Sequence, residues 1–327
     1  MEAQVKSWDR TVEWVLGELS IPDSCGIVLL YHRVARLRQD PQLLSVTPEH
    51  FEEQMDYLEE RFRVVDLKEL VRLAVRRRIQ ERLVSITFDD GYRDDAFVAR
   101  RILRKRGLQA ALFVTTGLLE SQDEFWVDQL EKIFLSPGSL PATLQIRVDG
   151  RGYEWDLEEY SDYSLADYEQ HAGWNILSRE DPTPRHKTYR DLCNLLRRLH
   201  PRERDSVINK LLDWSGIEHG ARPTHRTLGR QDLSRLVAGG VIEIGSHTVS
   251  HPMLSRLSRS DQEAEIRQSK TALEELLGRT VIGFSYPYGS WSDYRKETVR
   301  LVEEAGFSYA CTTIQRLVAV DVDPVSY

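Results

Sequence analysis

Two short stretches, Thr87-Phe88-Asp89-Asp90-Gly91 and Ser246-His247-Thr248-Val249-Ser250-His251, indicate the fold of this chain. Each one follows an apolar run typical of a buried strand, residues 83–86 and residues 241–245. The two stretches therefore place adjacent carboxylates and a pair of histidines at the ends of strands. One carboxylate and two imidazoles form a three-ligand set for a divalent metal ion, with positions left open for water and substrate. The second carboxylate, one residue away, is placed to take a proton from a metal-bound water, which is typical of a hydrolase.

Composition and charge limit the class of protein. The chain has 327 residues, of which 41% are hydrophobic, enough for one large α/β domain with an insertion. Its formal net charge of −8 argues against a nucleic-acid partner, and its 3 cysteines lie far apart, which predicts reduced thiols. Residues 1–20 lack the apolar core of a signal peptide, and no segment has the roughly 18 apolar residues of a membrane span. We therefore expect a soluble, cytoplasmic protein.

Strand and helix signals alternate along most of the chain. The expected strands are residues 26–31, 63–65, 83–88, 110–114, 241–245, 281–285 and 308–312. Expected helix starts are Thr47 with Pro48, Asp66 with Glu69, residue 94, Ser260 with Glu263, and Ser292. Seven parallel-type strands interleaved with helices favour a (β/α) barrel or an open α/β sheet. The polar motifs fall at the C-terminal ends of strands, where barrel enzymes hold their catalytic residues.

Residues 120–226 interrupt this alternation. The stretch is too long for a connecting loop, so we expect a folded, mainly helical insertion, or cap, on the active-site side of a single domain that spans residues 1–327. Within it we expect a hairpin around residues 148–152 and a helix through residues 192–199. Its aromatic residues either stack on a sugar ring or pack the core of the insertion, and packing is favoured for each of Trp126, Tyr153, Trp155 and Trp174.

Three motifs together resemble a known family. Thr-Phe-Asp-Asp-Gly, then His-Thr-x-x-His, then Phe284-Ser285-Tyr286-Pro287-Tyr288-Gly289 resemble the polysaccharide deacetylase family, the NodB-homology domain of carbohydrate esterase family 4. The opening Tyr31-His32-Arg33-Val34 is similar to a subgroup with an extra N-terminal strand. The resemblance covers residues 26–120 and 226–315. It implies a deformed (β/α)7 barrel and a hydrolase that removes an N-acetyl or other N-acyl group from an amino sugar in a polysaccharide or glycan precursor.

The resemblance also implies a metal centre. Asp90, His247 and His251 resemble the ligands of one divalent metal ion, most often Zn²⁺, while Asp89 resembles the general base. The i, i+4 spacing of the histidines lets both imidazoles reach one centre if the segment turns helically after Gly245. Because an amide carbonyl is a poor electrophile, a metal ion that polarises it and acidifies the attacking water suits this reaction.

Substrate contacts are implied around the same motifs. Tyr288 resembles the residue whose backbone N–H stabilises the tetrahedral oxyanion. The candidate substrate-binding residues adjoin the motifs and are Tyr92, Pro287 and Trp291. The implied partner is a carbohydrate that carries an N-acylated amino sugar. With no export signal expected, a nucleotide-linked or lipid-linked precursor is favoured over finished cell wall.

Three features depart from the family pattern. The arginine that stands four residues before the proline of the third motif is Gly283 here, so the partner of the base comes from elsewhere, with Arg93 as one candidate. No Asp-x-x-Asp-Trp motif is evident. The late Leu-x-His motif, whose histidine is the usual general acid, is also absent, and the chain ends soon after its seventh expected strand, which leaves truncation relative to its relatives open.

His32 is the candidate replacement for the missing general acid. It follows the first expected strand, on the same face of the barrel as Asp89 and His247, and its imidazole is expected to titrate near neutral pH. The alternative is a structural histidine that is hydrogen-bonded to Asp89 or to a neighbouring loop.

Two other functions are left open by the residues. Two histidines and a carboxylate also form the site of iron(II) oxygenases, although the alternation of strands and helices does not fit their usual double-sheet fold. A catalytically inactive relative would bind glycan, or scaffold a biosynthetic assembly, through the insertion. An assay of deacetylation with and without zinc separates both from an active hydrolase.

Overall fold

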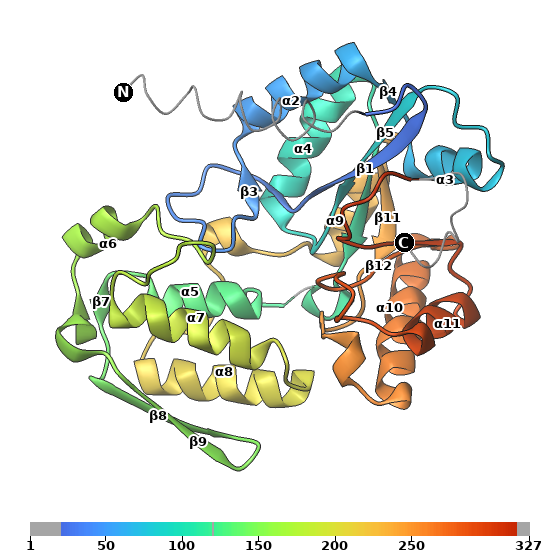
Figure 1. Ribbon diagram of the computed structural model, residues 1–327. Helices are drawn as coiled ribbons and strands as arrows, with labels where there is room; N and C mark the ends of the chain where they lie inside the picture. The colour runs from blue at the N-terminus through green and yellow to red at the C-terminus, as the bar shows by residue number, and fades with distance from the viewer. Residues whose placement is uncertain (1–20, 120, 319–327) are drawn as a thin grey trace.

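A sheet of seven parallel strands forms the centre of the protein, as the computed structural model shows for residues 21–119 and 121–318 (Figure 1). The strands are β1 (Cys25–Tyr31), β4 (Arg63–Val64), β5 (Arg82–Phe88), β6 (Ala110–Val114), β11 (Ile242–Ser246), β12 (Gly283–Ser285) and β13 (Tyr309–Cys311). Their order in space is β1-β5-β6-β11-β12-β13, with β4 also paired to β5. The sheet curls into a half-barrel surrounded by helices, which confirms the expected deformed (β/α) barrel.

Six outer helices in the described part of the chain flank the sheet. They are α2 (Pro48–Arg61), α3 (Leu67–Val75), α4 (Arg93–Arg106), α9 (Arg230–Val237), α10 (Arg259–Leu277) and α11 (Lys296–Glu304). Side chains cap the N-termini of α2, α3 and α10. Thr47 accepts a hydrogen bond from the N–H of His50, and Asp66 accepts one from the N–H of Glu69, so both expected N-caps are confirmed. Helix α9 was not expected from the sequence.

Two helix starts differ from the sequence expectation. Ser258, not Ser260, caps α10, and its hydroxyl oxygen accepts from the N–H of Asp261. Helix α11 begins at Lys296 rather than at Ser292. The reason is a turn in which the Asp293 carboxylate accepts hydrogen bonds from Ser290, which delays the helix.

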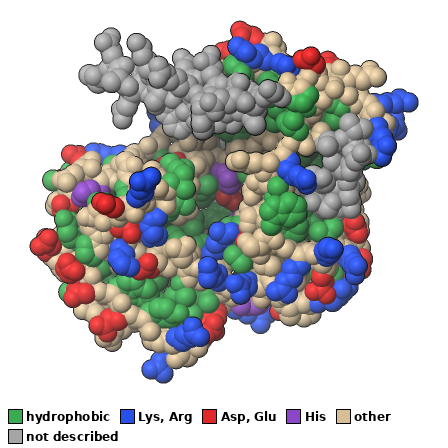
Figure 2. All heavy atoms as spheres, in the orientation of Figure 1, with side chains coloured by type: hydrophobic (Ala, Val, Ile, Leu, Met, Phe, Trp, Pro, Cys, Tyr) green, Lys and Arg blue, Asp and Glu red, His purple; other side chains and the backbone are tan. Residues whose placement is uncertain are grey.

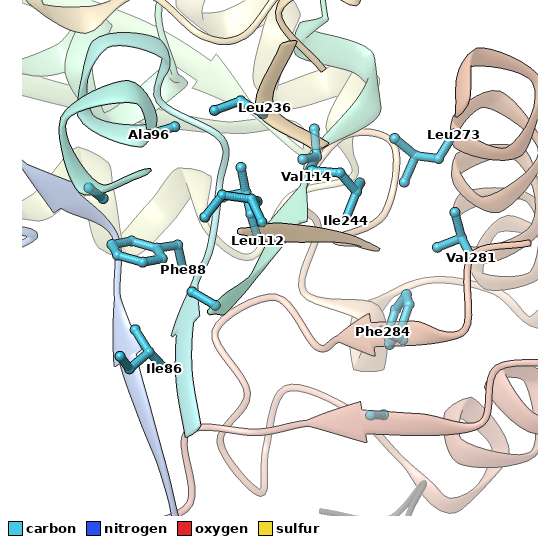
Figure 3. Packing of buried hydrophobic residues seen from close by; sticks show 14 of the residues in the cluster. Ile86, Phe88, Ala96, Leu112, Val114, Leu236, Ile244, Leu273, Val281 and Phe284 are labelled. Carbon is cyan, nitrogen blue, oxygen red and sulfur yellow. The ribbon is translucent and has the colours of Figure 1, made fainter. Parts of the chain in front are cut away.

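The core lies between the sheet and the outer helices. Figure 3 shows side chains from β5, β6, β11 and β12 directed toward side chains of α4, α9 and α10. Every residue of β6 is buried, as expected for a parallel strand covered on both faces. Leu112 and Phe284 are almost fully buried, and each such side chain stabilises the fold by about 1.5–3 kcal/mol. This packing fixes the strand ends that carry the polar motifs.

The insertion folds beside the half-barrel. Its elements are α5 (Trp126–Phe134), β7 (Gly138–Ser139), β8 (Thr143–Val148), β9 (Arg151–Asp156), β10 (Asp162–Tyr163), α6 (Leu165–His171), α7 (Pro184–Leu196) and α8 (Pro201–Ser215). In Figure 1, α5, α7 and α8 lie together, with the β8–β9 hairpin beneath them. The hairpin and the helix through residue 192 are as expected. The short strands β2 (Arg33–Val34) and β3 (Ser45–Val46) pair with each other outside the main sheet.

The insertion has an apolar cluster of its own. Trp126 and Trp174 are buried in it, which supports packing rather than sugar stacking for these two rings. Tyr153 and Trp155 stack on each other in the hairpin, with ring centroids 5.9 Å apart. They are partly buried against the same cluster. The aromatic residues of the insertion therefore pack mainly in its own core.

Helices suited to a bilayer are absent from the part of the chain that the structure describes. Within residues 21–119 and 121–318, each helix is too short or too polar to cross a membrane. Figure 2 shows lysine and arginine side chains interspersed with acidic side chains over one face of the molecule. Cys25, Cys193 and Cys311 are all free, as the sequence predicts.

Candidate metal centre

The candidate centre lies where the C-terminal ends of β5, β11 and β12 meet. Asp89 and Asp90 directly follow β5, and His247 directly follows β11. Strand β6 separates β5 from β11, and Thr115, the residue after β6, connects their ends. Its N–H donates to the carbonyl of Asp90 (3.4 Å), and its hydroxyl donates to the carbonyl of His247 (3.4 Å). The parallel sheet thus brings together motifs that are far apart in the sequence.

Three side chains converge as a ligand set. Nε2 of His247 lies 3.6 Å from Oδ1 of Asp90, and Nε2 of His251 lies 3.5 Å from the same oxygen. The ligand atoms of all three residues lie within 4.8 Å of one another. The side chains are largely buried, with 8% of Asp90, 2% of His247 and 12% of His251 exposed.

These distances suit ligands of one ion. They are too long for hydrogen bonds, and Oδ1 of Asp90 is buried without a hydrogen-bond partner. Ligands about 2.0–2.1 Å from a tetrahedral zinc ion lie about 3.3 Å from each other, close to the separations in this cluster. A buried, unpartnered oxygen that faces two imidazole nitrogens therefore fits a divalent metal ion such as Zn²⁺, and three ligands leave positions for water and substrate.

The orientation of His247 also fits metal binding. Its Nδ1 lies 2.8 Å from the carbonyl oxygen of Ser285, which can only accept a hydrogen bond. Nδ1 therefore carries the proton, and the lone pair of Nε2 faces Asp90. Burial lowers the pKa of His247 below its ordinary value, although Asp90 opposes this shift. The imidazole is consequently neutral at pH 7, as a metal ligand must be.

The segment that carries His251 is not helical, so the expected helical turn after Gly245 is wrong. Thr248 and His251 have positive φ angles of 66° and 55°. The N–H of His251 donates to Oγ1 of Thr248 (3.0 Å), and the Glu265 carboxylate of α10 accepts from the N–H groups of Val249 and Ser250. These side-chain acceptors hold a tight irregular turn, and it is this turn that directs His251 toward Asp90.

Asp89, the predicted base, lies beside the ligand set. Its Oδ2 accepts a hydrogen bond from the hydroxyl of Ser285 (2.9 Å) and lies 3.7 Å from Nε2 of His247. Its Oδ1 is buried and has no hydrogen-bond partner. Burial raises the pKa of Asp89 to about 7, and the Ser285 hydrogen bond opposes this rise. A carboxylate with a pKa near neutral pH both accepts and returns a proton readily.

Ser285, not Arg93, is the side chain that binds Asp89. Arg93 pairs with Asp232, with Nε 2.7 Å from Oδ2, so its candidacy is wrong. Gly283 leaves no room for the family arginine, because a Cβ there would lie 2.6 Å from the Tyr309 ring. Sequence reasoning missed Ser285, since a serine inside an apolar strand carries no distinctive signal.

Tyr288 lies in a tight turn beside His251. Its φ angle is 63°, and the hydroxyl of Thr313 donates to its carbonyl (2.7 Å). The Tyr288 ring lies against the imidazole of His251, with centroids 4.6 Å apart, and under the guanidinium of Arg197 at 4.2 Å. The turn is therefore held beside the ligand set, and the role of the Tyr288 N–H as an oxyanion donor stays a prediction.

The three candidate substrate-binding residues differ in exposure. Tyr92 is 2% exposed, and its hydroxyl donates to Asp128 (2.7 Å). Pro287 is also buried, and the roles of both residues in substrate binding stay predictions. Trp291 is 68% exposed on the loop between β12 and α11, which leaves it available to a sugar ring.

His32 does not titrate near neutral pH, contrary to the sequence expectation. Burial, together with the neighbouring His247, lowers the pKa of His32 to about 4. Its imidazole is therefore neutral at pH 7 and a poor source of a proton. Within the described residues, no hydrogen bond joins His32 to Asp89 either.

The insertion contacts the candidate centre directly. Phe125 packs edge-on against the ring of His251, with centroids 5.8 Å apart. Arg204 of α8 is 4% exposed and donates to the backbone carbonyls of Ser250 (2.7 Å) and His251 (3.2 Å). The insertion thus lies against the face of the barrel that carries the motifs. Its assignment as a cap that restricts substrate entry stays a prediction.

Comparison with known proteins identifies a family. The family model described as polysaccharide deacetylase matches residues 76–140 and 208–310, about half of the chain. The putative polysaccharide deacetylase YxkH of Bacillus subtilis (strain 168) is 32% identical over 72 residues, which is 22% of this chain and 25% of that protein. The alignment therefore spans about a quarter of the length of this curated relative.

Solved structures show the same fold. The deacetylase PplD of Streptococcus pyogenes, in complex with acetate, superposes with a TM-score of 0.55 at 17% identity, covering 93% of this chain and 90% of that one. IcaB from Ammonifex degensii superposes with a TM-score of 0.52 at 18% identity, covering 88% and 84% of the two chains. A barrel of this type does not match the double-sheet fold of the iron oxygenase alternative.

Proposed function

The chain belongs to the polysaccharide deacetylase family, and from this premise we propose that it is a metal-dependent amidohydrolase. Its substrate would be an N-acetylated, or otherwise N-acylated, amino sugar in a polysaccharide or glycan precursor. The observation that carries the proposal is the convergence of Asp90, His247 and His251, with Asp89 beside them. A cytoplasmic location is a further part of the proposal.

Asp90, His247 and His251 would hold one divalent ion, with Zn²⁺ favoured by the two imidazoles and one carboxylate. When bound, the ion would polarise the amide carbonyl and lower the pKa of the attacking water. The protein contributes the orientation of the ligands. Ser285 fixes the tautomer of His247, and the turn at residues 248–251 directs His251.

Asp89 would first accept a proton and then donate it. Its buried Oδ1 has no hydrogen-bond partner and is free to accept a proton from the attacking water. With its pKa near 7, the protonated carboxyl can then give this proton to the departing amine nitrogen as the C–N bond breaks. This path supplies the general acid without His32, whose neutral imidazole has no proton to spare at pH 7.

The backbone N–H of Tyr288 would stabilise the oxyanion that forms when water adds to the amide carbonyl. One preorganised donor of this kind contributes about 3–4 kcal/mol to transition-state stabilisation. The positive φ of Tyr288 and the hydrogen bond from Thr313 to the Tyr288 carbonyl, in the next peptide unit, would hold the turn that carries this N–H. The insertion would restrict which glycans reach the centre, because Phe125 and Arg204 contact the His251 segment.

Acetate release tests the proposal directly. Chelator-treated protein is assayed on N-acetylated glucosamine oligosaccharides before and after addition of stoichiometric Zn²⁺. We expect release of acetate that depends on the added metal and is absent in an Asp90→Asn variant, which loses a ligand but keeps the size of the side chain. The His219→Gln variant, altered at an exposed histidine of the insertion, is the matched control and should retain full activity.

Two outcomes would contradict the proposal. Acetate release that is unaffected by both the chelator and Asp90→Asn would exclude the metal-dependent reaction. Retained binding of the oligosaccharide without release under any metal would favour the inactive glycan-binding alternative.

A further inference from the structure

A second group of buried ligand-type side chains lies in the insertion. Asp128 and Glu131 belong to α5, and His225 lies at the end of the insertion, and their ligand atoms are within 4.8 Å of one another. We propose that Asp128, Glu131 and His225 bind a second divalent cation of the transition-metal class, such as Zn²⁺ or Mn²⁺. Two carboxylates and one imidazole are a ligand set that such ions accept.

His225 provides the observation that points to a ligand. It is 4% exposed, and its Nε2 is buried without a hydrogen-bond partner. This nitrogen faces Oε2 of Glu131 at 3.9 Å, too far for a hydrogen bond. The opposite nitrogen, Nδ1, lies 2.9 Å from the hydroxyl of Thr224, which fixes the ring in the way that a second-shell partner fixes a metal-bound histidine.

A hydrogen bond holds one oxygen of each carboxylate of the group. The Tyr92 hydroxyl donates to Oδ2 of Asp128 (2.7 Å), and Arg222 donates to Oε1 of Glu131 (2.8 Å). The second oxygen of Glu131, Oε2, faces Nε2 of His225. The protein therefore orients both carboxylates, which is how second-shell residues prepare ligands for an ion.

The charges of the surrounding side chains also favour a bound cation. Glu124, Asp128 and Glu131 are buried and face two cations, Arg222 and Arg33. Three carboxylates and two guanidinium groups leave one negative charge uncompensated, and buried charge is costly unless it is balanced. Burial accordingly raises the pKa of Asp128 to about 8. Either a bound proton or a cation restores the balance, and the unpartnered imidazole favours the cation.

The position of the group gives the cation a structural role. Helix α5 lies near the start of the insertion and His225 near its end, so one ion would join the two. The segment after His225 is hydrogen-bonded to the loop that carries the catalytic carboxylates. The N–H of Leu228 donates to Gly91 (2.9 Å), and the N–H of Arg93 donates to Arg226 (2.9 Å). The ion would therefore clamp the insertion to the loop after β5.

Metal stoichiometry tests this inference. The full-length protein is stripped with a chelator, incubated with Zn²⁺ or Mn²⁺, desalted, and its metal content per chain is measured by mass spectrometry. We expect about two ions in the wild type, one in His225→Gln, one in His251→Gln and none in the double variant. The control His219→Gln alters an exposed histidine of the same insertion and should keep both ions.

A single ion in the wild type would overturn the inference and would leave a bound proton as the balancing charge. Two ions retained in His225→Gln would overturn it as well. Should His225→Gln fail to fold by circular dichroism, His251→Gln decides alone, since one ion there supports the second site and none excludes it. The first site is counted separately in these variants, so failure of the second site leaves the proposed function untouched.

Discussion

The barrel and the insertion approach the candidate centre in different ways. Barrel residues reach it with side chains that follow strand ends, so Asp89, Asp90 and His247 present their functional atoms directly. The insertion contacts the segment that carries one ligand, because Arg204 donates to the backbone carbonyls of Ser250 and His251 and Phe125 packs against the His251 ring. The difference indicates that the barrel supplies the chemistry and that the insertion holds part of the geometry. Substitutions in the two regions should therefore affect different properties of the protein.

The largest effect is expected in the barrel, at Asp89. Asn keeps the size of the side chain but cannot accept a proton, so Asp89→Asn should lower kcat by about 10²–10⁴-fold. Its metal content should stay that of the wild type, because we assign Asp89 as the base and not as a ligand. Steady-state kinetics and metal analysis of the same preparation check both statements. Loss of the metal as complete as in Asp90→Asn would show that the two roles are wrongly assigned.

A smaller effect is expected in the insertion, at Arg204. Arg204→Met keeps much of the buried stem but removes both hydrogen bonds to the His251 segment, so metal affinity should weaken by about 10–100-fold. Competition with a chromophoric chelator measures this without reference to activity. The control is Arg202→Met, at an exposed residue of the same helix. Equal affinities in the two variants would mean that the insertion does not position His251.

The pH dependence of kcat/KM distinguishes the role of Asp89 from that of its hydrogen-bond partner, Ser285. Because burial raises the pKa of Asp89 to about 7, kcat/KM should fall tenfold per pH unit below that value, where the carboxylate becomes protonated. The Ser285 hydrogen bond favours the charged form and lowers this pKa, so Ser285→Ala should move the acid limb to higher pH. At pH 7 the loss should be less than about tenfold. A profile that moves to lower pH would contradict this arrangement.

The smallest effect is expected at Trp291, which contrasts with the buried tryptophans of the insertion. A ring that stacks on a sugar contributes about 0.5–1.5 kcal/mol, so Trp291→Ala should raise KM by about two- to tenfold with kcat nearly unchanged. Trp291→Phe should retain most of the affinity. Kinetics on oligosaccharides of increasing length check this, and an unchanged KM for every length would remove Trp291 from the substrate site.

Most of the barrel could be predicted from the sequence because its signals are local. The apolar run of residues 110–114 and the caps at Thr47 and Asp66 each specify an element by themselves. The order of the motifs at strand ends also placed Asp90 and His247 correctly beside each other. Parallel strands bring their C-terminal ends to one edge, so local patterns were sufficient there.

The features of the site that the sequence did not predict depend on contacts between distant segments. The turn at His251 is held by Glu265 of α10, and the partner of Asp89 is Ser285, 196 residues away. Burial also lowers the pKa of His32, which the sequence did not predict. None of these properties is encoded in a short pattern, so only the folded chain reveals them.

Anomalous diffraction at the zinc edge, from crystals grown with stoichiometric Zn²⁺, tests the metal centre most directly. The predicted result is a peak about 2.0–2.2 Å from Oδ1 of Asp90 and from Nε2 of both His247 and His251, with Asp89 outside the coordination shell. A peak coordinated by Asp89 in place of Asp90, or no peak among these three residues, would contradict the assignment of the centre.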